Sequence, residues 1–177
     1  MNNGILIPIR LSSTRLPGKA LLDINGKPCI QYLIERIESV TSIDNIVICT
    51  TNATSDNKLI EFSKKIGVKI FRGNEKDILD RFKDAALKFG FENIIVVDGD
   101  DIFCEPKLID LTINELNKNI AEYVFWKDLP LGVSPVGIKT SALIKICDKK
   151  ETLDTETGWG RFFTETSMFN IKCLTSA

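Results

Sequence analysis

Short hydrophobic runs and amphipathic segments alternate along the chain. Four of the runs are rich in β-branched residues and nearly uninterrupted, at residues 5–9, 46–49, 68–71 and 94–97. Uninterrupted runs of this length are typical of parallel strands that are buried on both faces of a sheet. The pattern therefore predicts four buried strands, with helices needed to cover both faces.

Segments with a helical period separate these runs. The first helix is expected to begin at Pro28, and the second to occupy residues 55–66. The third ends before Gly90, a residue typical of a helix C-cap, and the fourth begins at Pro106. The β-α-β-α-β-α-β order predicts a doubly wound α/β sheet with mostly parallel strands and right-handed crossovers.

The pattern after residue 97 is weaker but still divides into elements. We expect a helix at residues 141–148 and strands at residues 123–126, 134–138 and 168–174. No linker, internal repeat or low-complexity tract interrupts the chain, so we expect one domain over residues 1–177. Ligands in such sheets bind beyond the carboxyl ends of the strands, which directs attention to the loops that follow the first and fourth runs.

The composition is that of an ordinary globular chain. It has 177 residues, of which 44% are hydrophobic, 23 are Lys or Arg and 24 are Asp or Glu. A net charge of −1 gives no overall field to attract nucleic acid or an anionic membrane, so we expect neither partner. The five cysteines are widely spaced, which fits neither a disulfide framework nor a zinc site. With no signal-peptide pattern at the N-terminus, a cytoplasmic location is expected.

Histidine is absent from the chain, and its absence excludes several classes of enzyme. Ser-His-Asp triads and the zinc hydrolase motifs both need it. Any proton transfer must use carboxylates, Lys, Tyr, Cys or water. Reactions that rely on positioning and electrostatic stabilisation remain open.

Three cations, Arg10, Arg15 and Lys19, follow the first predicted strand. The loop that carries them also supplies hydroxyl and backbone donors, among them Ser12, which can bind phosphate oxygens beside the charged groups. It is neither a Walker A loop nor a Gly-x-Gly-x-x-Gly turn, because the required glycines are missing. A local phosphate site is one interpretation, and a loop of solvated cations is the other.

Three acids, Asp98, Asp100 and Asp101, follow the fourth predicted strand. Carboxylates this close repel one another unless a cation shares the space. Mg²⁺ suits the place, since it is held by one or two carboxylates together with substrate phosphates. The alternative is an Asx-type turn before the helix at Pro106. Cations on one loop and acids on the other together suit a complex of a metal with a nucleoside triphosphate.

Three segments carry a resemblance to one enzyme family. They read IPIRLSSTRLPGKALLDINGKP at residues 7–28, FRGNEKDILDRFKDAA at 71–86 and VDGDD at 97–101. These segments resemble the sugar-acid cytidylyltransferases, which make CMP-Kdo and CMP-sialic acids, and their spore-coat polysaccharide relatives. The resemblance covers residues 5 to about 110. It implies a single Rossmann-like nucleotidyltransferase domain of the nucleotide-diphospho-sugar transferase type, with helices flanking a mostly parallel sheet.

The resemblance also implies roles for individual residues. The triphosphate of CTP would be held by Arg10, Ser12, Arg15 and Lys19, and Mg²⁺ would be bound by Asp100. Arg10 and Lys19 would stabilise the leaving pyrophosphate, so the expected catalytic residues are these two and Asp100. In the family reaction, a hydroxyl of a sugar acid attacks the α-phosphorus of CTP. The product serves the synthesis of surface polysaccharides such as lipopolysaccharide.

Arg81 and Asp98 are further candidates for substrate binding. The FRG segment follows a strand, which would bring Arg81 toward the nucleotide, although Asp77 and Asp80 beside it also suit the first turn of a helix. Asp98 stands where the family often has Gln or Thr.

Four aromatic residues invite a functional interpretation: Trp126, Trp159, Phe162 and Phe163. Core packing is expected for most of them, with ligand stacking or a homodimer surface as alternatives.

Two departures from the family pattern concern the acceptor and the metal. The relatives carry acids near Ser134 and Val136, in a region that contacts the sugar, and this chain has neither. They also place a second metal carboxylate near the C-terminus, beyond the length of this chain. Either the chain is C-terminally incomplete, or the role moves to Asp154, Glu156 or Glu165. An ordinary solvated loop explains these three acids equally well.

Two other functions remain open at this point. A metal-dependent glycosyltransferase would use Asp98-Gly99-Asp100 as an Asp-x-Asp motif for a nucleotide sugar, but it leaves the cationic loop without an obvious role. A non-catalytic nucleotide-binding relative would explain the missing acids near Ser134 and Val136. Release of pyrophosphate from CTP distinguishes the favoured transferase from both.

Overall fold

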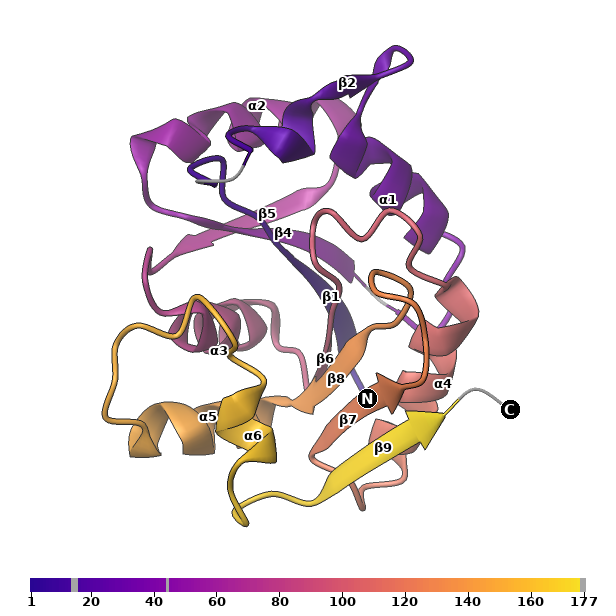
Figure 1. The fold of residues 1–177 in the computed structure, drawn as a ribbon, viewed down its shortest axis with the longest axis vertical. Coiled ribbons are helices and arrows are strands. Elements are labelled where there is room, and N and C mark those ends of the chain that lie inside the picture. Colours follow the sequence, from indigo (N-terminus) through magenta and orange to yellow (C-terminus); the bar gives the residue numbers. More distant parts are fainter. Residues whose placement is uncertain (14–15, 44, 176–177) are drawn as a thin grey trace.

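The computed structural model describes residues 1–13, 16–43 and 45–175. Its centre is a seven-stranded sheet with the order β5-β4-β1-β6-β8-β7-β9 (Figure 1). β8 runs antiparallel to both of its neighbours, and the other neighbouring pairs are parallel. The strands are β1 (Asn3–Pro8), β4 (Asn45–Thr51), β5 (Lys69–Gly73), β6 (Asn93–Val96), β7 (Tyr123–Lys127), β8 (Val136–Lys139) and β9 (Ile171–Thr175).

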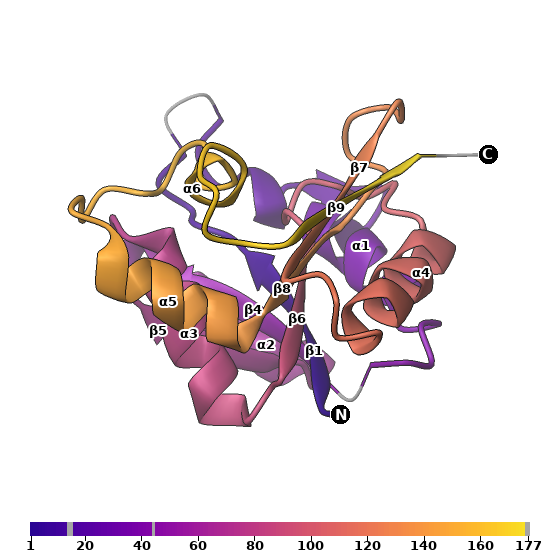
Figure 2. The same ribbon diagram turned by 90° about the horizontal axis from the view of Figure 1, so that it is seen from below.

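Helices cover both faces of this sheet, with α1 and α4 on one side of the central strands and α3 and α5 on the other (Figure 2). Two short 3₁₀ helices precede longer elements, η1 (Lys19–Leu21) and η2 (Thr54–Asp56). The α-helices are α1 (Cys29–Ile37), α2 (Asn57–Ile66), α3 (Ile78–Phe89), α4 (Pro106–Asn117), α5 (Thr140–Lys149) and α6 (Arg161–Thr164). No helix in the described ranges is long and apolar enough to cross a membrane.

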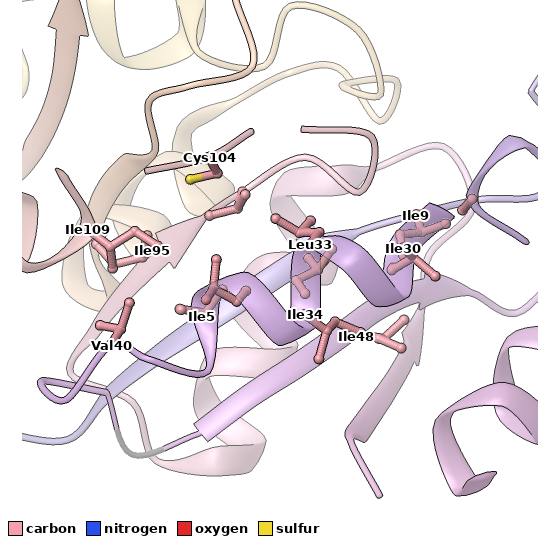
Figure 3. Close-up of a cluster of buried hydrophobic side chains, with 14 of the residues drawn as sticks. Ile5, Ile9, Ile30, Leu33, Ile34, Val40, Ile48, Ile95, Cys104 and Ile109 are labelled. Carbon is pink, nitrogen blue, oxygen red and sulfur yellow. The ribbon is translucent and has the colours of Figure 1, made fainter. Parts of the chain in front are cut away.

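The strand β1 shows why the predicted runs are continuously hydrophobic. Successive side chains of a strand point to opposite faces, so Ile5 and Ile7 join the cluster formed with α1, α2 and α4. Ile5 is labelled among the residues of this cluster in Figure 3. Leu6 joins the second cluster, formed with α3, α5 and α6. All three side chains are completely buried. The predicted α/β fold with a mostly parallel sheet is therefore confirmed.

The helix signals in the sequence also correspond to observed ends. Asp77 caps α3, because its side chain accepts a hydrogen bond from the backbone N–H of Asp80 at 3.1 Å. Gly90 ends the same helix with φ +70°, the left-handed conformation that glycine adopts without strain. Pro106 occupies the first turn of α4 as predicted, whereas Pro28 lies one residue before α1.

Three observed features go beyond the prediction. β8 is antiparallel because only the loop 128–135 separates it from β7, and a parallel return would need a crossover of a dozen residues or more. The small hairpin of β2 (Asp23–Ile24) and β3 (Lys27–Pro28) precedes α1, around a tight turn at Asn25-Gly26. α6 was not expected at all, since its single turn is too short to give a periodic pattern.

The close contact of β8 with α4 yields a prediction about Gly137. A Cβ atom at this position would lie 2.5 Å from Cγ2 of Thr112 and 2.9 Å from Cδ1 of Leu116, both on α4. We expect Gly137→Ala to lower the free energy of unfolding by about 1–3 kcal/mol through overpacking. Chemical denaturation measures the change, with Lys107→Ala on the same helix as a control that should change little. Equal stability of the Gly137→Ala and wild-type proteins would show that α4 moves away at no cost.

Candidate active site

A cleft of about 400 Å³ opens at the carboxyl ends of β1 and β6. These strands are parallel neighbours, with Leu6 paired to Val96, so the loops that follow them leave the sheet side by side. The pairing extends past the strands, because the backbone N–H of Gly99 donates to the carbonyl of Pro8 at 3.3 Å. The opposite wall of the cleft is formed by Ile78 and by residues 156–159.

The first wall carries the predicted cations. Arg10, Ser13 and Lys19 line the cleft, whereas Ser12 is exposed and is not among the lining residues. Arg15 lies outside the described residues. The loop is closed at its base, since the backbone N–H of Gly18 donates to the carbonyl of Leu11 at 3.0 Å.

Both described cations of the cleft are paired with an acid. The ammonium of Lys19 binds the carboxylate of Asp100. The Nε atom of Arg10 lies 3.6 Å from Oε1 of Glu156, on the opposite wall. All four side chains line the cleft, so the wall with the cations lies next to the aspartates, which form the floor. An anionic ligand would have to exchange these protein partners for its own oxygens.

The aspartates of the floor lie in a tight turn made by backbone groups. The backbone N–H of Asp101 donates to the carbonyl of Asp98 at 2.9 Å, and Asp98 and Asp100 line the cleft. A Cβ atom on Gly99 would lie 2.4 Å from Cγ1 of Ile9, so this position requires glycine. Among the described residues, no backbone N–H donates to the three carboxylates, which differs from an Asx-type turn. Asp98 and Asp100 therefore face the cleft without backbone partners in the described part of the chain, and Asp100 is paired with Lys19.

The electrostatics of this turn favour a bound cation. Enclosure by the protein raises the pKa of Asp98, and the negative charge of Asp100 raises it further. Burial raises the pKa of Asp101 to about 6, with smaller contributions from Asp98 and Asp100, while Lys19 opposes both shifts. The smaller contributions from neighbouring carboxylates show that the three aspartates repel one another, and Lys19 is the cation that opposes this repulsion.

The chemistry of these donors fits Mg²⁺. No group of three or more His, Cys, Asp or Glu side chains among the described residues could hold a metal without help. Mg²⁺ does not need such a group, because it is bound by one or two carboxylates, by water and by substrate phosphates. Asp100 and Asp98 can supply that part of the coordination.

Glu156 is the principal acid of the opposite wall. Its two carboxylate oxygens accept hydrogen bonds from Arg81 at 3.0 and 3.2 Å, and Arg81 also donates to the carbonyl of Asn74 at 2.6 Å. Arg81 is only 1% exposed and does not line the cleft. It therefore lies behind the site and contacts it through Glu156. Of the three acids considered for a second metal carboxylate, Glu156 alone lines the cleft; Asp154 and Glu165 do not.

The segment with Glu156 is held by a buried polar cluster that the sequence did not reveal. Lys150 forms an ion pair with Asp77, and both side chains are at least 96% buried. Thr155 is completely buried, and its hydroxyl donates to the carboxylate of Asp77 at 2.7 Å. Its backbone N–H donates to the carbonyl of Lys76 at 2.9 Å. Asp77 thus caps α3 and at the same time fixes the opposite wall of the cleft.

The aromatic residues pack mainly in the core, as expected. Phe163 is completely buried and stacks on Tyr123 with ring centroids 4.7 Å apart. Trp126 donates through Nε1 to the hydroxyl of Thr112 at 2.9 Å. Trp159 is the exception, because it lines the cleft while its ring meets Phe82 edge-on at 5.5 Å. It is available as an apolar surface for a ligand.

The buried cluster yields a prediction about acid stability. Burial by itself would raise the pKa of Asp77, but hydrogen bonds from Lys150, Thr155 and the backbone of Asp80 outweigh it and lower the pKa. A lowered pKa stabilises the fold above the unfolded pKa of about 3.9, and this stabilisation is lost as pH falls through the folded pKa. Asp77→Asn also leaves Lys150 buried beside a neutral group, so we expect it to destabilise the protein by roughly 3 kcal/mol or more at pH 7.

The measurement is the free energy of unfolding of both proteins between pH 7 and pH 2. We expect the difference between wild type and Asp77→Asn to be constant at neutral pH and to shrink below about pH 4. A difference that stays constant down to pH 2 would show that the Asp77 charge does not stabilise the fold.

Comparison with known proteins points to one enzyme family. The family model described as "Cytidylyltransferase" matches residues 4–169. The spore coat polysaccharide biosynthesis protein SpsF of Bacillus subtilis is 31% identical over 80% of this chain and 60% of its own length. The 3-deoxy-manno-octulosonate cytidylyltransferase of Geobacter sulfurreducens is 36% identical over 68% of this chain and 48% of its own length. The chain thus spans about half to three fifths of the length of these two relatives.

Solved structures show the same fold. A cytidylyltransferase from Leptospira borgpetersenii superposes with a TM-score of 0.87 at 27% identity, over 99% of this chain and 76% of that one. A CMP:2-keto-3-deoxy-manno-octonic acid synthetase in complex with CTP has a TM-score of 0.80 at 18% identity, over 100% of this chain and 90% of that one. At this lower identity the likeness concerns the fold alone. Because the family model covers nearly the whole chain, this protein belongs to the cytidylyltransferase family of nucleotidyltransferases.

Proposed function

We propose that this protein transfers CMP from CTP to a sugar acid and releases pyrophosphate, as a cytoplasmic step in the synthesis of a surface polysaccharide. One observation carries the proposal: Arg10 and Lys19 on one loop face Asp98 and Asp100 on the next, within a single cleft. Such a site matches a nucleoside triphosphate that arrives with a divalent cation. The acceptor class follows the names of the relatives in Geobacter and Bacillus. The five unpaired thiols suit a reducing compartment.

Arg10 and Lys19 would bind the triphosphate. In the free protein they are paired with Glu156 and Asp100, so binding replaces two carboxylate contacts with phosphate contacts. Both ion pairs are at least partly exposed, which makes this exchange inexpensive. Once bound to phosphate, the two cations would stabilise the charge that develops on the leaving pyrophosphate. Arg15 remains a predicted third ligand, and Ser13 lines the cleft where Ser12 was expected.

Asp100 and Asp98 would hold Mg²⁺ against the phosphates. The metal supplies Lewis-acid stabilisation of charge on the phosphoryl oxygens. Displacement of Lys19 from Asp100 by the nucleotide would free this carboxylate for the metal, so the two events favour each other. The residues of the chain then act by positioning, which needs no histidine.

The reaction joins the hydroxyl oxygen of the acceptor to the α-phosphorus and breaks the bond between the α-phosphorus and the bridging oxygen. Pyrophosphate leaves, and the hydroxyl proton passes to water or to a carboxylate at the cleft. Glu156 and Trp159 form the wall opposite the cations. In the proposed complex, a carboxylate that accepts hydrogen bonds and an apolar ring would therefore face the triphosphate. Glu156 is held by Arg81, so its position is fixed before any substrate binds.

The test is a pyrophosphate-release assay with CTP, UTP, dTTP and ATP against a panel of sugar acids and sugar phosphates. We expect release from CTP with at least one sugar acid and little release from the other nucleotides. Binding of CTP without release for any acceptor would instead favour a non-catalytic relative. Consumption of a nucleotide sugar without use of CTP would favour a glycosyltransferase.

Nucleotide selectivity is also expected in the absence of an acceptor. A ligand that binds only the folded protein stabilises it by RT ln(1 + [L]/Kd), or about 2.7 kcal/mol at a hundredfold excess over Kd. We therefore expect CTP with Mg²⁺ to raise the melting temperature well above the value with ATP and Mg²⁺. Equal shifts for the two nucleotides would contradict a cytidine-selective site.

Asp100→Asn is expected to separate metal binding from folding. Asn keeps the size of the side chain and removes the negative charge, so turnover should fall on the order of a hundredfold or more. The melting temperature without ligand should hardly change, because the Lys19–Asp100 pair is exposed and its loss is offset by weaker repulsion among the aspartates. Asp154→Asn is the matched control, since Asp154 is exposed and lies outside the cleft. Near-normal turnover of Asp100→Asn at saturating Mg²⁺ would overturn the metal assignment.

A further inference from the structure

Asp56 is a completely buried carboxylate that the mechanism above does not use. It ends η2 and stands at the N-cap position of α2, where an aspartate normally accepts a hydrogen bond from the first turn of the helix. Its side chain makes no such bond. Helix capping therefore does not explain why this carboxylate is buried, and its actual partners lie elsewhere.

One oxygen of the carboxylate is held by the end of β4. Oδ2 accepts hydrogen bonds from the hydroxyl of Thr50 at 2.9 Å and from the backbone N–H of Thr51 at 3.2 Å. The hydroxyl of Thr51 donates to the same oxygen. These three donors fix the carboxylate and offset the free-energy cost of burying its charge. The other oxygen, Oδ1, has its partners outside β4, one of them the hydroxyl of Ser55 at 3.4 Å.

The other oxygen binds the cationic loop. Oδ1 accepts a hydrogen bond from the backbone N–H of Leu11 at 2.8 Å, across 45 positions of sequence. The carbonyl of Leu11 in turn accepts from the backbone N–H of Gly18 at 3.0 Å. Both backbone groups of Leu11 are thus fixed, and its side chain is only 8% exposed. Leu11 is the point at which the two ends of the loop meet.

The two cations of the cleft are the chain neighbours of the hydrogen-bonded residues Leu11 and Gly18. Arg10 directly precedes Leu11, and Lys19 directly follows Gly18. Gly18 has φ +69°, and this left-handed conformation turns the chain into η1, which begins at Lys19. A shift of Leu11 would therefore move both cations, although Asp56 itself does not line the cleft.

We propose that Asp56 is a positioning residue that sets the geometry of the triphosphate site by holding Leu11. The inference rests on the proposed function, because it assigns Arg10 and Lys19 to the phosphates. The carboxylate suits this role better than a neutral group, since hydrogen bonds to an ionised acceptor are shorter and stronger. Burial would raise the pKa of Asp56, but hydrogen bonds from Thr51, Leu11 and Thr50 outweigh it and lower the pKa. The group is consequently ionised at neutral pH.

The test compares two substitutions of Asp56 by calorimetric titration with CTP and Mg²⁺, and separately with inorganic tripolyphosphate. Asp56→Ala removes the acceptor for Leu11, and we expect the Kd for both ligands to rise on the order of tenfold or more, because small displacements of positioned groups are costly. Asp56→Asn keeps one oxygen that can accept from Leu11 but turns its NH2 group toward the donors of Thr50 and Thr51, so we expect its Kd to lie between those of wild type and Asp56→Ala. A lower Kd for Asn than for Ala, although both lack the charge, distinguishes positioning of the loop from a need for the charge alone.

A matched control separates positioning from loss of stability. Thr140 is a buried polar residue at the opposite end of β6, where its hydroxyl donates to the carbonyl of Phe91 at 2.6 Å. Thr140→Val should lower the melting temperature and leave the Kd for tripolyphosphate unchanged. If Asp56→Ala does not fold, Thr51→Val removes one donor to the carboxylate and should weaken binding by a smaller factor.

The outcomes are distinguishable. Absence of binding of CTP and tripolyphosphate by the wild-type protein would overturn the proposed function and this inference with it. Normal binding by wild type together with an unchanged Kd in Asp56→Ala, or in Thr51→Val if that variant is used, would overturn the inference alone. A weaker Kd in the Asp56 variant and in Thr140→Val alike would also overturn it, because the effect would then be one of general stability.

Discussion

The parallel pairing of β1 with β6 is the constraint on which the cleft depends. Both strands are covered by helices on both faces, and their carboxyl ends reach the same edge of the sheet. One loop at that edge carries the cations Arg10 and Lys19, and the next carries Asp98 and Asp100. Opposite charges from two distant parts of the sequence are brought together without any further element. The close approach at Gly99, where a Cβ would meet Ile9, keeps the two loops in contact.

The charges of the cleft are nearly balanced before a ligand arrives. Lys19 is paired with Asp100, and Arg10 with Glu156, while the aspartate turn retains an excess of negative charge. A ligand of one sign would leave one member of each pair without a partner. A triphosphate that carries a divalent cation brings both signs, so its phosphates can take the cations and its metal the carboxylates. Under the proposed function, the same arrangement would let a protein with a net charge of −1 bind a highly charged substrate.

The sequence predicted those features that depend on local patterns. The continuous runs around Ile5 and Ile94 identified buried strands, and the cap at Asp77 and the glycine at position 90 identified the ends of α3. The contact between the cationic loop and the aspartate turn also followed, because the topology of parallel sheets brings such loops to one edge. The direction of β8 was not predicted from the sequence. The patterns of β7 and β8 are weak, so the sequence did not establish that both are strands joined by a short loop, which is what makes them antiparallel.

The polar groups that hold the cleft in place were not predictable. Asp77 contacts Lys150 and Thr155 across more than seventy positions of sequence, and Arg81 reaches Glu156 over a similar distance. Nothing in the local sequence distinguishes these side chains from solvated charges on helices and loops, because only the tertiary fold brings them together. Arg81 illustrates the point: its position after a strand suggested a ligand contact, and the structure places it behind the cleft.

The central claim is that the cleft between the cationic loop and the aspartate turn binds the triphosphate of CTP. A crystal structure of the protein with CTP and Mg²⁺ tests it most directly. The account predicts phosphate oxygens within hydrogen-bond distance of Arg10 and Lys19, the metal in contact with Asp100, and Lys19 no longer paired with that carboxylate. Density for the nucleotide at another part of the surface, with the Lys19–Asp100 and Arg10–Glu156 pairs intact, would contradict it.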